Sequence, residues 1–149
     1  MTVRLTLGEL RTARDVDLGA GDWLIVDQER IDHFARATDD HQWIHVDPAR
    51  AAAGPFGRTV AHGYLTMSLV PRLFAGLLEI TDRRMGVNYG IDRLRLIAPV
   101  VAGARIRLRA VLRSAEPRGE GYLLRVGAEI EIEDVDRPAL VGELLYMAL

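Results

Sequence analysis

Asp40 and His45 are the two residues whose side chains and spacing most strongly suggest chemistry. They lie five positions apart in Asp40-His41-Gln42-Trp43-Ile44-His45-Val46-Asp47-Pro48, directly after a segment of helical periodicity ends. Carboxylates and imidazoles are the common general acids and bases of enzymes, because their pKa values can be tuned toward neutral pH. We therefore interpret Asp40 and His45 as an acid/base pair that can act on one water molecule.

Helices are expected on both sides of this pair. Asp27 is a candidate N-cap for the preceding helix, which Asp39 ends, and Asp47 followed by Pro48 has the N-cap and first-turn pattern of a second, short helix. Residues 41–46 are then expected to form a loop held at both ends. Such a loop can direct two side chains toward one point.

The longest apolar segment follows, from about His62 to Ile80. Its hydrophobic residues cover nearly every face of a helix, which predicts a single buried helix. Pro71 should kink it or loosen its hydrogen bonding, and Gly63 near its start should expose backbone N–H groups at the positive end of the helix dipole.

The second half of the sequence has the alternation of β-strands. Four strands are expected, at residues 86–97, 105–115, 122–133 and 140–149, separated by segments rich in Gly, Pro and Asp. Arg105–Arg109 and Glu129–Glu133 alternate charged with aliphatic residues, and their opposite charges favour pairing as antiparallel neighbours.

The first 26 residues carry weaker signals. Thr6-Leu7-Gly8-Glu9 has the form of a capping box and predicts a short helix to about Arg14, and Trp23–Val26 is a short apolar run that predicts an extended segment. Together the pieces predict an α+β hot-dog fold, one antiparallel sheet wrapped around one long central helix with short capping helices. We expect a single domain over residues 1–149. We also expect a homodimer, because a lone curled sheet leaves edges to be covered.

The composition excludes several classes of function. All 19 basic residues are Arg, so Schiff-base chemistry on a lysine is excluded, and the absence of Cys excludes disulfides, thiolate nucleophiles and cysteine metal sites. A formal net charge of −2 makes nucleic acid or an anionic membrane an unexpected partner. With no apolar run of membrane-spanning length, a soluble cytoplasmic protein is expected.

His41 and His45 are four residues apart and would share a helix face as metal ligands. Gln42 stands where a His-Glu-x-x-His zinc hydrolase requires glutamate, and the expected loop spoils the ligand geometry. No metal is therefore expected.

At this point the sequence resembles the MaoC-like hydratase/dehydratase family, the R-specific enoyl-CoA hydratases. The resemblance depends on three segments: Phe34–Asp47 resembles the hydratase motif, Gly54–Gly57 with Ala61–Leu65 resembles the loop and helix start that bind the thioester carbonyl, and Val87–Arg95 leading to Ala98–Val100 is similar to the first strand after the helix.

This chain departs from the family pattern at three places before the helix. Asp39 stands where the family usually has Gly, Gln42-Trp43 where many members have Asn-Pro, and Arg58-Thr59 where a Gly-Pro-like pair is common. The acid/base pair itself is retained. These departures therefore concern substrate range and loop shape more than the reaction.

The resemblance implies reversible, R-specific hydration of a trans-2-enoyl thioester to an (R)-3-hydroxyacyl thioester. Asp40 and His45 would bracket the water, and the backbone N–H of Gly63 would form the oxyanion hole. His62, Asn88, Tyr89 and Phe74 would contact the substrate. No cofactor is expected, because coenzyme A or an acyl-carrier protein belongs to the substrate.

Two other functions fit the same fold. A hot-dog thioesterase would hydrolyse the thioester and release free thiol. A non-catalytic subunit would bind acyl thioesters without turning them over, and the fold alone does not exclude this.

Overall fold

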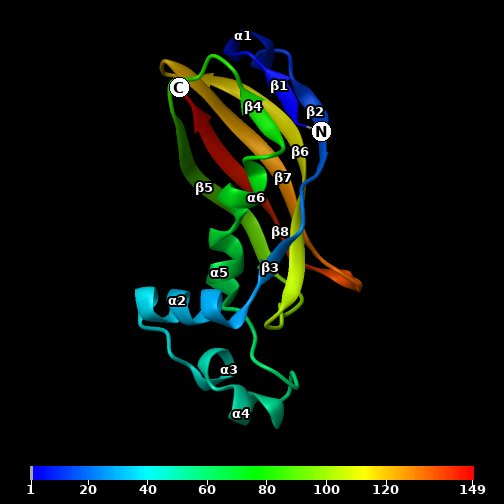
Figure 1. The fold of residues 1–149 in the computed structure, drawn as a ribbon. Helices are drawn as coiled ribbons and strands as arrows, with labels where there is room; N and C mark the ends of the chain where they lie inside the picture. The colour runs from blue at the N-terminus through cyan, green and yellow to red at the C-terminus, as the bar shows by residue number, and fades with distance from the viewer. Residues whose placement is uncertain (1) are drawn as a thin grey trace.

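The computed structural model describes residues 2–149. Figure 1 shows the arrangement of the elements. In chain order they are β1 (Val3–Leu5), α1 (Leu7–Leu10), β2 (Arg14–Ala20), β3 (Leu24–Val26), α2 (Gln28–Thr38), α3 (Trp43–Val46), α4 (Pro48–Ala52), α5 (Gly63–Ser68), α6 (Val70–Phe74), β4 (Leu78–Ile80), β5 (Gly86–Leu96), β6 (Ala104–Arg118), β7 (Gly121–Ile132) and β8 (Val135–Ala148).

The main sheet is antiparallel and has the strand order β2-β6-β7-β8-β5, with β3 also paired to β6. Figure 1 shows its long strands passing α5 and α6, while α2, α3 and α4 lie together at one end of the molecule. Leu65, Leu69 and Leu73 belong to the same core cluster as the inward-facing side chains of the sheet. The predicted hot-dog architecture is confirmed.

The predicted pairing of the two charged runs is also confirmed. Arg107 lies opposite Glu131 on the neighbouring strand, and Arg109 lies opposite Glu129. The carboxylate of Glu131 accepts from Arg107 Nε at 2.5 Å and from Arg109 Nε at 3.0 Å, and Arg105 forms an ion pair with Glu133. Cross-strand pairs of opposite charge favour this register over a slipped one.

The prediction of one long helix over residues 62–80 is wrong. The segment forms two short helices, α5 and α6, and then β4, which pairs in parallel with β1. The break at Leu69 precedes Pro71, which lies in the first turn of α6, where its missing N–H leaves no helical hydrogen bond unmade. Tertiary pairing with the chain's N-terminal strand takes the last apolar residues out of the helix.

The expectation that this segment is buried on every face is wrong as well. Tyr64 is 69% exposed and Ser68, Pro71 and Arg72 are exposed, whereas Leu65 and Leu73 are buried. In a single chain, α5 and α6 therefore bury one side only.

The N-terminal region differs from its prediction in one respect. The helix after Thr6 is shorter than expected, but Thr6 and Glu9 do form the reciprocal capping box. The following strand β2 was not predicted, because a register shift between Asp17 and Gly19 and the positive φ of Asp15 interrupt its alternation. Among the described residues, no helix is long and apolar enough to cross a membrane.

Candidate active site

Helix α2 ends so that Asp40 leaves it in a defined direction. Asp27 caps its start by accepting a hydrogen bond from Arg30 N at 2.9 Å, as predicted. Asp39 at its end is left-handed, with φ of 58°. This conformation favours Gly, and Asp is one of the few other residues that adopt it readily. Asp39 therefore makes the turn for which the family usually has Gly.

His45 lies on a helical turn and not on the expected loop. Residues Trp43–Val46 form α3, which Asp47 follows as N-cap of α4 by accepting from Arg50 N. The Nδ1 atom of His45 lies 2.7 Å from the carbonyl oxygen of Val60. A carbonyl only accepts, so Nδ1 carries the proton and the lone pair of the neutral ring is on Nε2.

Gln28 connects three segments around His45. Its Nε2 donates to the carbonyl of His45 and to Asp32 Oδ1, both at 2.8 Å, and its Oε1 accepts from the hydroxyl of Thr59. The backbone of Val60 donates to the carbonyl of Ile44 at 3.0 Å. Hydrogen bonds from Gln28 and from Val60 thus fix α3. No sequence motif had marked Gln28 as part of the site.

His62 is stacked on His45. Their ring centroids are 3.8 Å apart with an interplanar angle of 24°, and Phe34 packs on the other side of His62 at 5.0 Å. His62 Nε2 lies 2.9 Å from the backbone carbonyl of Asp40, which makes this nitrogen the donor. Its Nδ1 is buried and has no hydrogen-bond partner within residues 2–149.

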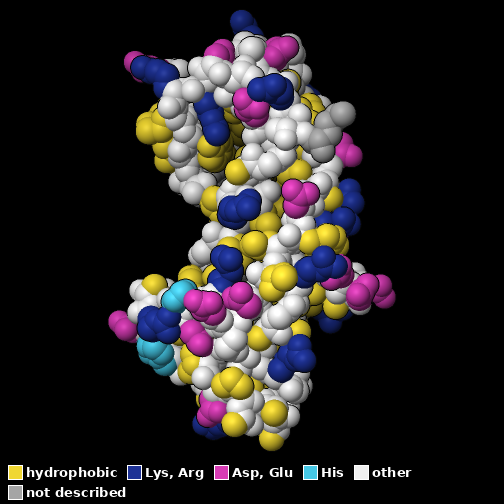
Figure 2. All heavy atoms as spheres, viewed as in Figure 1, with side chains coloured by type: hydrophobic (Ala, Val, Ile, Leu, Met, Phe, Trp, Pro, Cys, Tyr) yellow, Lys and Arg dark blue, Asp and Glu magenta, His cyan; other side chains and the backbone are white. Residues whose placement is uncertain are grey.

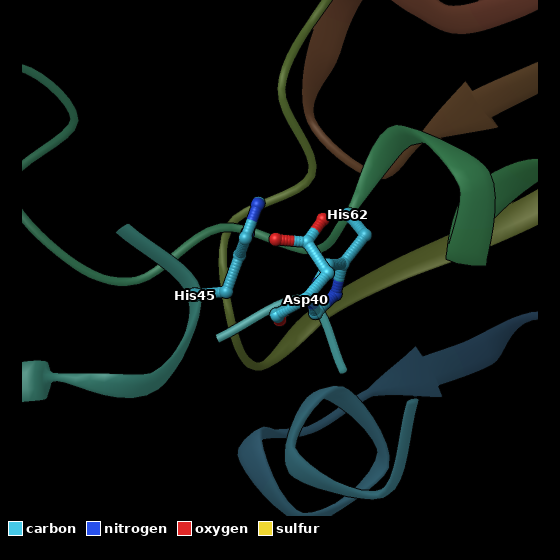
Figure 3. Close-up of side chains that lie close together, drawn as sticks. All are labelled: Asp40, His45 and His62. Carbon is cyan, nitrogen blue, oxygen red and sulfur yellow. The ribbon is translucent and has the colours of Figure 1, made fainter. Parts of the chain in front are cut away.

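Asp40, His45 and His62 therefore converge from three different segments. One ligand atom from each lies within 4.8 Å of the others, and Figure 3 shows the Asp40 carboxylate directed toward the ring of His45. Both histidines are buried, whereas Asp40 is exposed. A carboxylate open to solvent and a buried imidazole therefore lie close together.

Burial lowers the pKa of His45 below its usual value, and the neighbouring His62 lowers it further. The hydrogen bond to Val60 and the charge of Asp40 act in the opposite direction but are outweighed. His45 is therefore neutral at pH 7, with Nε2 free to accept a proton.

The same three side chains have the composition of a two-histidine, one-carboxylate metal site. The lone pair of an imidazole nitrogen lies in the ring plane, so two histidines share an ion only if their planes converge on it. The planes of His45 and His62 are nearly parallel and stacked, and they do not meet about 2 Å from both nitrogens. This geometry disfavours a shared metal ion and suits proton transfer.

Gly63 begins α5, directly after His62. Its N–H has no hydrogen-bond acceptor among the described residues, as is usual for the first residue of a helix. A Cβ built on Gly63 would lie 2.3 Å from Cδ1 of Leu96, so the side chain of Leu96 occupies the space beside this backbone. Leu96 is half exposed.

A cavity of about 400 Å³ lies further along α5 and α6, between these helices and strands β5 and β8. Figure 2 shows a hollow in the upper part of the molecule, bordered by hydrophobic and basic side chains. Of the predicted substrate contacts, Phe74 and Asn88 line the cavity. Tyr89 does not line it; its side chain is 49% exposed and its hydroxyl accepts from Arg118 at 2.6 Å.

Among protein-family models, that of the MaoC-like domain matches residues 10–130 of this chain. This chain belongs to the MaoC-like family.

Two curated relatives of this MaoC-like protein match over nearly their whole length. The 3-hydroxyacyl-thioester dehydratase Z of Mycobacterium tuberculosis is 42% identical over 139 residues, covering 93% of this chain and 92% of that protein. Nodulation protein N of Rhizobium leguminosarum bv. viciae is 46% identical over 141 residues, covering 93% and 88%.

Among solved structures, an R-hydratase from Pseudomonas aeruginosa in the unliganded form superimposes on this MaoC-like protein with a TM-score of 0.78. The alignment covers 97% of this chain and 85% of the other at 21% identity, and it therefore shows a shared fold.

Proposed function

We propose that this chain is an R-specific 2-enoyl-thioester hydratase that also runs in reverse as a 3-hydroxyacyl-thioester dehydratase. The observation that carries the proposal is the convergence of the Asp40 carboxylate and the His45 ring within 4.8 Å. The hydrogen bond from His45 Nδ1 to Val60 supports it, because it leaves Nε2 as a proton acceptor. The relative from Mycobacterium tuberculosis has a name of the same reaction class.

In the hydration direction, one water lies between the two side chains. His45 Nε2 accepts one of its hydrogens and the Asp40 carboxylate accepts the other. The water oxygen bonds to C3 of the enoyl thioester, the electron pair of the double bond moves toward the thioester oxygen, and the pair of side chains holds the released proton. That proton then passes to C2, so one water is added and both side chains are restored. Addition on one face gives the (R)-3-hydroxyacyl product.

The N–H of Gly63 is proposed to stabilise the negative charge that develops on the thioester oxygen. Its lack of an acceptor supports this role. The half-exposed side chain of Leu96 lies beside the Gly63 backbone and is proposed to border the bound thioester. No cofactor enters the proposed reaction.

The remaining predicted contacts are assigned to the acyl thioester. The apolar cavity beside Phe74 and Asn88 is proposed to hold the acyl tail. His62 is proposed to support the pair by stacking on His45, and Tyr89 to contact the part of the thioester that lies outside the cavity. Coenzyme A or an acyl-carrier protein would carry the substrate.

We propose a homodimer in the cytoplasm as the working form. Strand β5 is the last strand of the sheet order, with one unpaired edge, and its side chains Val87, Tyr89 and Ile91 are exposed. A long hydrophobic edge strand is normally covered in a soluble protein. Light scattering on the purified protein tests this, and a monomer at all concentrations would contradict it.

The decisive assay follows the conjugation absorbance of trans-2-enoyl-CoA substrates of several chain lengths. The protein should consume this absorbance, and chiral analysis should find the (R)-3-hydroxyacyl product. Free thiol should not accumulate; thiol release with no addition of water to the double bond would identify a thioesterase instead. Binding with no turnover across the whole panel would identify a non-catalytic subunit.

Two variants connect this activity to the site. Asp40→Asn and His45→Ala should each lower kcat by about 10³-fold, within the usual contribution of acid/base groups. His41→Ala is the matched control, since His41 is exposed and lies between the two residues in sequence without joining the cluster. Wild-type rates in both site variants would refute the assignment.

A further inference from the structure

A cationic side chain lies in the wall of the otherwise largely apolar cavity. Arg83, in the turn after β4, is one of its lining residues. Most of the wall comes from the apolar side chains of α5, α6, β5 and β8, among them Met67, Val70, Phe74, Ile91 and Leu144. Arg83 is exposed, so its guanidinium borders both this apolar wall and the solvent.

Arg83 is held in this place by Tyr146. The Nη1 atom of Arg83 donates to the Tyr146 hydroxyl at 2.5 Å, and its Cζ atom lies 5.7 Å from the centroid of the Tyr146 ring. The Tyr146 ring in turn meets Phe74 edge-on, with centroids 6.1 Å apart. The Arg83–Tyr146 pair therefore lies near the end of α6.

The backbone of Gly86 makes room for this pair. A Cβ built on Gly86 would lie 1.5 Å from the hydroxyl oxygen of Tyr146 and 3.1 Å from Nη1 of Arg83. No other residue type fits there without moving the tyrosine. Gly86 thus leaves the space in which Tyr146 holds the Arg83 guanidinium at the cavity.

Arg83 forms no ion pair with the carboxylates of residues 2–149. Its neighbour Arg84 differs, since it pairs with Glu120 at 3.2 Å and does not line the cavity. Arg83 retains hydrogen-bond donors beyond the one given to Tyr146, because a guanidinium has five. It can therefore bind a further acceptor.

The position of Arg83 relative to the proposed reaction centre suggests which acceptor this is. Phe74 lies 11 residues after Gly63, at the end of the second of the two short helices α5 and α6. A thioester held at Gly63 with its tail along these helices would bring the far end of the tail toward Arg83. An apolar tail alone would make no use of the guanidinium donors that Tyr146 leaves free.

We propose that the end of the cavity at Arg83 and Tyr146 binds an anionic group at the far end of the acyl chain, so that the preferred substrates include ω-carboxylated acyl thioesters. This inference rests on the proposed function, which supplies the thioester end. The tail carboxylate would accept hydrogen bonds from the Arg83 guanidinium, with the Tyr146 hydroxyl fixing the orientation of that guanidinium.

The first test is binding without chemistry. Calorimetry compares linear dicarboxylic acids with their neutral dimethyl esters, using wild type, Arg83→Met and the matched control Arg84→Met. Wild type and Arg84→Met should prefer the dicarboxylic acid by about fivefold, a modest factor because Arg83 is exposed. Arg83→Met should lose this preference. Equal preference in all three proteins would overturn the inference.

The second test uses turnover. The ratio of kcat/KM for an ω-carboxylated enoyl-CoA to that for the methyl-ended enoyl-CoA of equal length should fall about fivefold in Arg83→Met, with the methyl-ended substrate unaffected. If methyl-ended substrates react and the ratio is insensitive to Arg83, the inference fails while the proposed function stands. If no enoyl thioester reacts, the proposed function fails, and the binding test still reports on the cavity.

Gly86→Ala provides an independent variant that keeps the charge. The added methyl group should displace the Tyr146 hydroxyl and lower the preference for dicarboxylic acids, as Arg83→Met does. Light scattering of each variant is required as well. If Arg83→Met dissociates the protein into monomers, the guanidinium serves a subunit contact and the inference is overturned.

Discussion

The two ends of the α5–α6 segment differ in polarity and in how firmly their side chains are held. At the Gly63 end, the stacked and buried rings of His45 and His62 lie beside the Asp40 carboxylate, and each ring is hydrogen-bonded to a backbone carbonyl. At the Phe74 end, an apolar cavity meets one guanidinium. The proton transfer proposed for the first end requires a fixed geometry, whereas the tail selection proposed for the second end requires only volume and one polar contact. The comparison suggests that reaction rate and substrate choice can be changed separately.

The largest expected effect separates the ends directly. Asp40→Asn or His45→Ala should slow every acyl thioester by about 10³-fold, because the same proton transfers serve them all. The ratio of kcat/KM between long and short tails should stay at its wild-type value. A selective loss for one chain length would show that the two ends are not independent.

A substitution in the cavity wall should have a smaller effect on rate, and this effect should depend on the length of the acyl tail. Ala75 is exposed at the end of α6 and lines the cavity, so Ala75→Phe should reduce its volume. Long acyl tails should lose about tenfold in kcat/KM, equivalent to losing one or two buried methylene contacts, while short tails are unaffected. Arg72→Phe is the control, since it adds a ring to the same helix outside the cavity. A uniform loss of rate for all tails would contradict the separation.

Gly63→Ala tests the junction between the ends. The added Cβ would clash with Leu96 and should destabilise the protein by about 1–3 kcal/mol, measured by urea unfolding. Adding Leu96→Ala should relieve the clash and restore that part of the stability. Activity should remain low if substrate approaches this backbone as proposed. Gly76→Ala is the control, because a Cβ there meets no atom within 4 Å.

The smallest effect concerns pH. Because burial and His62 lower the pKa of His45, the neutral ring persists to a lower pH than a free histidine, and kcat/KM should fall only on the acid side of the usual histidine range. Replacing the stacked ring in His62→Gln removes both effects in part and should raise the pKa of His45. The acid limb of the profile should then move to higher pH.

The control for this prediction is His33→Gln, since His33 is exposed on α2. An NMR titration of His45 provides a readout that does not depend on activity. An unchanged His45 titration in His62→Gln would show that the stacked pair does not set its proton affinity. Tail preference should be the same in both variants, because neither residue lines the cavity.

Local rules explain which parts of the structure the sequence predicted. The N-caps Asp27 and Asp47 act within three residues of themselves, and the Arg–Glu ladder between β6 and β7 follows from alternation within each strand. Asp40 and His45 were identifiable as a pair because their spacing is also local.

The errors arose where distant segments compete with local preference. The local sequence of Leu78–Ile80 favours a helix, but in the folded chain this segment pairs as a strand with β1, more than 70 residues earlier. Gln28 carries no sequence signal, because its partners His45 and Thr59 are separated from it by 17 and 31 residues. The hydrogen bond between Arg83 and Tyr146 joins residues 63 positions apart, so it could not be predicted without the strand arrangement.

The contacts that hold His45 would also couple the proposed catalysis to folding. Its backbone is fixed by Gln28 on α2 and its ring by Val60, which itself forms an isolated β-bridge with Val101. None of these partners is near His45 in an unfolded chain, so a partially assembled state that lacked any one of them would hold the imidazole loosely. Enzymatic competence should therefore disappear in the same cooperative transition as the tertiary structure, with no active intermediate.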